Sequence, residues 1–106
     1  MPTVPAAFVN QTHLANEVEQ AIQKLGPEVV RVRYNVGDDM SGDRSIFFRI
    51  VLTDTASREE TLADISGDIT TVFYDEFRPY ENWGLIPYFS FRSQSEQAAR
   101  HDAAWE

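Results

Sequence analysis

The spacing of the apolar residues changes abruptly at Gly26-Pro27, and this change most constrains the fold. Upstream of it, apolar residues recur at the period of an α-helix: Leu14, Val18, Ala21, Ile22 and Leu25. Downstream, residues 29–36 alternate with a period of two, which is typical of a strand with one face in the core. Because Gly-Pro is also a strong stop signal, the chain predicts a helix followed directly by a strand.

A second alternating segment, at 45–53, follows a loop rich in glycine and aspartate at 37–43. These two strands are therefore expected to form a hairpin. Residues 57–78 then return to helical spacing, and Ser57 followed by Glu60 has the pattern of a capping box. The sequence thus predicts a long second helix after the hairpin.

The rest of the chain predicts a loop at 79–84 and a third strand at 87–92, where Pro87 favours a position at the edge of the sheet. Residues 1–9 contain two prolines and are expected to form an extended lead-in. Ser93 followed by Glu96 has the pattern of a second capping box, and residues 94–106 are expected to form a short helix or a tail.

The length of 106 residues suits one domain spanning the whole chain, 1–106. The predicted order of elements is α-β-β-α-β. If the second helix returns the chain beside the first strand, the strands form a three-stranded antiparallel sheet of order 2-1-3, with both helices on one face. We therefore expect an α+β fold, a two-layer sandwich.

The chain is acidic, with a formal net charge of −8. Residues 54–81 contain eight acidic residues and two arginines, so this stretch carries most of the negative charge. Such a chain repels a phosphate backbone, and we do not expect nucleic acid as its partner. The sequence has no cysteine, no signal-peptide pattern and no run near the ~20 apolar residues of a membrane span, so we expect a cytoplasmic protein without membrane contact.

The alternation places arginines and aromatic rings on the sheet face opposite the helices, provided that Phe89 and Phe91 point into the core. The residues predicted for this face are Arg31, Arg33, Phe47, Arg49, Tyr88 and Arg92. Guanidinium groups beside aromatic rings suit phosphates and bases, or the acidic side chains of another protein. Three other interpretations stay open: a solvated face, a face paired with a second copy, and a face covered by the C-terminal residues.

The second helix carries Glu60, Asp64 and Asp68 on one face. A single row of carboxylates on a helix is far more often solvated than a metal site, so we expect no bound metal. Docking of a basic partner is the better functional interpretation of this row. Tyr80 and Trp83, in the predicted loop, are candidates for a further contact surface.

No linear motif points to catalysis or to a cofactor. His13 and His101 have no neighbouring serine or cysteine in a nucleophile pattern, and the five glycines make no phosphate-binding loop. We therefore expect no catalytic residues and no cofactor. The sequence favours binding over catalysis, and an enzyme without a recognisable motif is the third functional hypothesis.

Two segments, 42–52 (GDRSIFFRIVL) and 87–93 (PYFSFRS), resemble parts of small uncharacterised bacterial proteins, some of which accompany toxin–antitoxin-like genes. The resemblance covers residues 28–106 and implies a small bacterial interaction protein. Our leading hypothesis is a non-enzymatic binding or regulatory protein that acts through protein–protein contact, as a homodimer through the open sheet face or as the acidic partner of a basic protein. The alternative is a binder of a nucleotide or single-stranded nucleic acid on the arginine face.

Overall fold

The computed structural model describes residues 11–106, so the lead-in expected at 1–9 lies outside the described residues. The elements follow one another as α2 (Gln11–Ile22), β1 (Val29–Asp38), β2 (Arg44–Leu52), α3 (Glu59–Val72), a π-helical turn η1 (Phe73–Phe77), α4 (Pro79–Trp83), β3 (Ile86–Ser93), α5 (Gln94–Arg100) and a 3-10 turn η2 (Ala103–Trp105). The α+β class is confirmed. Within the described residues, no helix is both long and apolar enough to cross a membrane.

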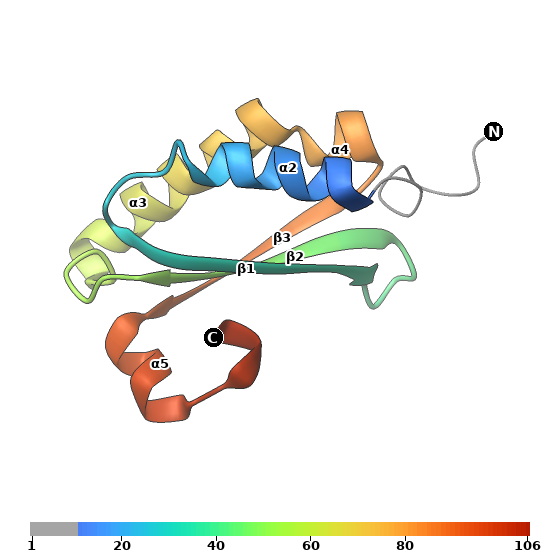
Figure 1. The fold of residues 1–106 in the computed structure, drawn as a ribbon. Helices are drawn as coiled ribbons and strands as arrows, with labels where there is room; N and C mark the ends of the chain where they lie inside the picture. Colours follow the sequence, from blue (N-terminus) through green and yellow to red (C-terminus); the bar gives the residue numbers. More distant parts are fainter. Residues whose placement is uncertain (1–10) are drawn as a thin grey trace.

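The elements form three layers rather than the expected two (Figure 1). Helices α2, α3 and α4 cover one face of the sheet, whereas α5 and the chain's last residues lie against the other. The expected pair of helices therefore does cover one face, but residues 94–106 add a layer on the opposite side. The sandwich has its sheet in the middle.

The predicted strand order, 2-1-3, and the fully antiparallel sheet are wrong. The order is β1-β2-β3, in which β2 is antiparallel to β1 and parallel to β3. Residues 53–85 contain α3 and α4, and this crossover returns the chain to the end of the sheet where β2 begins, as a parallel pair requires. Pro87 lies on an edge strand, as predicted.

A bulge at the start of β1 reverses the predicted sides of two valines. Val29 pairs with Leu52 and Arg31 pairs with Val51, so Val30 is an extra residue without its own partner. Val29 consequently packs against the core and Val30 is exposed, whereas strict alternation predicted the opposite. From Arg31 onward, the strand alternates as expected.

The main core lies between the sheet and the helices α2, α3 and α4, and its centre is aromatic. Phe48 of β2 is 4.4 Å from Phe73 and 5.2 Å from Phe89, measured between ring centroids. Leu14 and Val18 of α2 are almost fully buried in the same cluster. Phe89 and Phe91 pack against it, which confirms that they point inward.

The second helix differs from its prediction at both ends. Arg58, and not Ser57, is its N-cap and makes no side-chain cap bond. The Ser57 hydroxyl donates to the main-chain oxygen of Thr53 at 3.0 Å. The expected capping box is therefore absent at this helix. At the other end, the chain passes through η1 and turns at Arg78, whose φ is 51°. The expected loop at 79–84 is largely the short helix α4, with Pro79 in its first turn.

Candidate functional site

The four predicted arginines do share one face of the sheet. Arg31 and Arg33 lie on β1, Arg49 on β2 and Arg92 on β3. We call this side of the sheet the arginine face, and residues 94–106, which lie against it, the C-terminal segment. The interpretation that the chain's own C-terminal residues cover this face is therefore confirmed for the part that carries the arginines.

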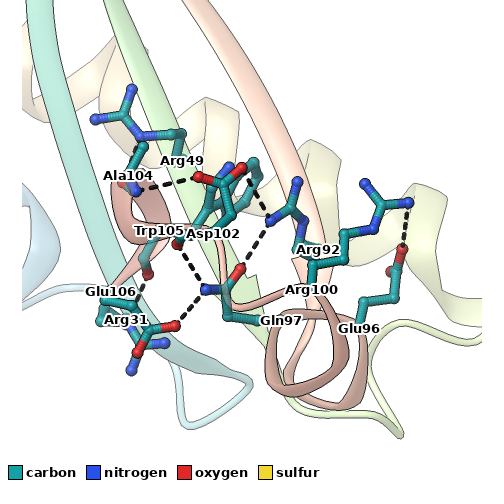
Figure 2. Close-up of polar contacts among 10 residues, drawn as sticks. All are labelled: Arg31, Arg49, Arg92, Glu96, Gln97, Arg100, Asp102, Ala104, Trp105 and Glu106. Atoms are coloured by element: carbon teal, nitrogen blue, oxygen red, sulfur yellow. Dashed lines mark hydrogen bonds and ion pairs between the residues drawn. The ribbon is translucent and has the colours of Figure 1, made fainter.

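Three of the arginines hold the end of the C-terminal segment by its main chain. Their guanidinium groups donate hydrogen bonds to successive main-chain oxygens, two of which are drawn in Figure 2: Arg49 to Ala104 at 2.7 Å, Arg31 to Trp105 at 2.8 Å and Arg33 to Glu106 at 2.6 Å. Charged donors make stronger hydrogen bonds than neutral ones. The segment is thus fixed along its backbone.

The fourth arginine, Arg92, holds side chains of the same segment (Figure 2). Its guanidinium donates to the Gln97 side-chain oxygen at 2.7 Å and lies 3.6 Å from the Asp102 carboxylate. It also lies over the Trp105 ring, 4.1 Å from the centroid, in a cation–π contact. Only 11% of the Arg92 side chain is exposed, so these partners replace most of its water.

Gln97 completes this polar network from α5. It is 2% exposed, and its amide nitrogen donates to the main-chain oxygen of Asp102 at 2.8 Å and to the Glu106 carboxylate. Val51 of β2 is also buried, at 1%, yet it does not belong to the main core cluster. The C-terminal segment therefore closes a second, smaller buried layer over the arginine face.

The start of α5 is fastened to the loop after β2. The expected Ser93–Glu96 capping box is present in both halves. In addition, the Asp54 carboxylate accepts hydrogen bonds from the Ser95 main-chain N–H, at 2.9 Å, and from the Ser95 hydroxyl. These two bonds stabilise the charged form and hold the pKa of Asp54 below its usual value.

Acid is expected to loosen the C-terminal segment at this contact. Because the pKa of Asp54 is lower in the folded than in the unfolded chain, the contact stabilises above about pH 4 and is lost as the pH falls further. Asp54→Asn keeps an oxygen acceptor but does not titrate. Hydrogen-exchange protection of α5 should therefore decrease more steeply with acid in the wild type than in Asp54→Asn, and identical profiles would contradict this role.

Part of the same sheet face is left open, around Phe47 and Tyr88. Their rings are stacked, with centroids 5.4 Å apart, and with Met40 they line a hollow of about 330 Å³. The Tyr88 hydroxyl donates to Asp39 at 2.8 Å, a bond that raises the pKa of Tyr88 and lowers that of Asp39. We call Met40, Phe47 and Tyr88 the open patch.

The remaining predicted residues do not join this site. Glu60, Asp64 and Asp68 are exposed on α3, on the other side of the sheet. Within residues 11–106, no three histidine or acidic side chains come together as a metal site. Tyr80 is exposed, but Trp83 is buried in the main core, because the predicted loop is helical and turns its indole inward. The expectation that Trp83 offers a contact surface is therefore wrong.

Sequence reasoning missed the side chains that occupy the arginine face, which are Gln97, Asp102 and Trp105, and it missed Asp54, which holds the start of α5. A large apolar residue at position 105, after the capping box at Ser93, was the available signal that the segment packs onto the domain. The resemblance to bacterial proteins stays a prediction. Comparison of the chain with protein-family models, with curated proteins and with solved structures found no match.

Proposed function

We propose that this chain is a small non-enzymatic binding protein that acts through protein–protein contact, and that its open patch pairs with a second copy. The observation that carries this proposal is the hollow that Met40, Phe47 and Tyr88 line together with Asp38, Asp39 and Ser41, and whose exposed lining is mostly apolar. Apolar side chains gathered around a hollow on an otherwise charged surface are typical of an interaction site.

The patch is suited to pairing with itself. Met40 is fully exposed at the rim of the hollow. In a two-fold pair, the same surface of each copy meets the other, so each Met40 enters the hollow of its partner and both hollows are filled. The flexible thioether of methionine packs well against aromatic rings such as the stacked Phe47 and Tyr88.

The rival hypothesis, an anionic ligand on the arginine face, has less support. Arg31, Arg49 and Arg92 already donate to oxygens of the C-terminal segment, so an anion has to displace those contacts. The acidic row on α3 lies on the helix-covered side and does not contribute to either surface.

Sedimentation velocity over a range of concentrations tests the pairing. Met40→Asp and Phe47→Asp each place a charge in the desolvated contact and should abolish self-association, while circular dichroism shows a retained fold. The matched control is Tyr80→Asp, which changes an exposed aromatic residue on α4 and should leave association unchanged.

Salt separates this proposal from its rival. Two copies that each carry a net charge of −8 repel one another, so screening by salt should strengthen an apolar pair. Binding of a phosphate backbone has the opposite salt dependence. A wild-type chain that stays monomeric at all concentrations and salts, or a Met40→Asp variant that associates as the wild type does, would refute the pairing.

A further inference from the structure

We propose that the arginine face is a binding site for an acidic peptide segment of a partner protein that forms a short 3-10 turn, and that the C-terminal segment of this chain, which forms such a turn at η2, occupies that site when the partner is absent. The proposal concerns the covered part of the sheet face. It does not depend on the pairing of the open patch, which lies outside these contacts.

The arginine face binds the C-terminal segment largely through main-chain oxygens. Arg31, Arg33 and Arg49 bind the main-chain oxygens of three consecutive residues, at 2.8, 2.6 and 2.7 Å. Every peptide carries such oxygens, so these guanidinium groups recognise a chain path rather than one sequence. Charge-assisted donors arranged along two neighbouring strands are therefore able to hold a segment from another molecule in the same way.

The side-chain contacts define which segment fits. Arg92 contacts the Asp102 carboxylate at 3.6 Å and the Trp105 ring at 4.1 Å, so one guanidinium recognises an acid and an aromatic residue three positions later. Trp105 is 8% exposed, so its ring is buried where it lies against Arg92. The partner segment that fits best therefore carries Asp or Glu, two intervening residues and an aromatic residue.

The C-terminal segment is also separable from the main core. Trp105 and Gln97 are buried but lie outside the cluster that joins the sheet to α2 and α3. The capping box at Ser93 stabilises α5 locally, without using a residue of the arginine face. The segment competes strongly because it is tethered, at an effective concentration in the millimolar range. Weakening its own contacts should therefore open the site.

The test measures binding of a labelled synthetic peptide of residues 94–106 to the full-length chain by fluorescence anisotropy. Trp105→Ala removes the buried ring from the tethered segment but not from the peptide, so this variant should bind the peptide at least about tenfold more tightly than the wild type does. Two matched controls should lose that gain: Arg49→Met added to Trp105→Ala, and the peptide with alanine in place of its tryptophan.

Hydrogen exchange of α5 reports whether the tethered segment has been released. If Trp105→Ala leaves it in place, Gln97→Ala is added, which removes the second buried anchor. A folded variant with a released segment that does not bind the peptide overturns the proposal. So does a variant that cannot fold, because the segment is then an integral part of the domain. Tighter binding of oligothymidylate than of the peptide overturns it in favour of a nucleic-acid site.

Discussion

Replacing Phe48 by alanine is expected to lower the free energy of unfolding by about 3–5 kcal/mol, the usual cost of truncating a buried phenylalanine. Phe48 is 1% exposed in the middle of β2. Its ring lies 4.4 Å from Phe73, 5.2 Å from Phe89 and 6.3 Å from Phe77, between centroids. These three rings belong to two other elements, η1 and β3, so the cavity cannot close through the movement of one neighbour. Because a domain of this kind has a total stability of about 5–15 kcal/mol, the loss is a large fraction of it.

The adjacent residue supplies the control. Phe47→Ala makes the same chemical change one position earlier, on the opposite face of β2, where the ring is half-buried and stacks on Tyr88. Its expected cost is about 0.5–1.5 kcal/mol, the range of one aromatic pair. Urea denaturation followed by circular dichroism measures both values. Equal losses for the two variants would contradict the assignment of the two faces.

The local elements and the composition of each face were predictable from the sequence. The periods of two and of 3.6 residues are properties of neighbouring residues, so they locate α2, β1 and β2 and place Arg31, Arg33 and Arg49 on one side. The alternation gave the wrong faces for Val29 and Val30 because β1 contains a bulge there. One extra residue in a bulge shifts every residue before it to the other face.

The strand order was not predictable from alternation, because it depends on where the crossover through α3 and α4 leaves the chain. One signal was nevertheless present in the sequence. Residues 46–52 of β2 are apolar except for Arg49, as is typical of a central strand with both faces covered. This apolar run favours a central position for β2, and the structure does place β2 between β1 and β3.

The occupation of the arginine face was considered but not assigned from the sequence, and the reason is chemical. Arg31, Arg33 and Arg49 bind main-chain oxygens, which every residue has, so no residue type reveals the partner. The capping box at Ser93 indicated where a helix could begin, because it depends on two side chains at fixed spacing, and of the two expected forms, a short helix or a tail, residues 94–100 form the helix. Among the residues that follow α5, Trp105 indicates that the segment packs onto the domain, but no residue indicates which face of the sheet it meets.

The sequence predicted that Trp83 forms a surface contact, whereas the structure places its indole in the core. Its side chain is 5% exposed, stacks on Phe77 at 6.2 Å and meets the His13 ring edge-on at 5.4 Å, between centroids. The indole N–H donates to the Glu17 carboxylate at 3.2 Å, which ties α4 to α2.

Trp83→Ala is therefore expected to cost about 3–5 kcal/mol of unfolding free energy, from the cavity and from the lost hydrogen bond. Trp83→Phe keeps an aromatic ring and should lose less. Tyr80→Ala, an exposed change on the same short helix, should stay within about 0.5 kcal/mol of the wild type. Urea titrations of the three variants decide the matter. The open patch lies on the opposite side of the sheet from Trp83, so a core role predicts a destabilised chain whose folded fraction associates as the wild type does. A stable Trp83→Ala chain with altered self-association would instead support a surface role.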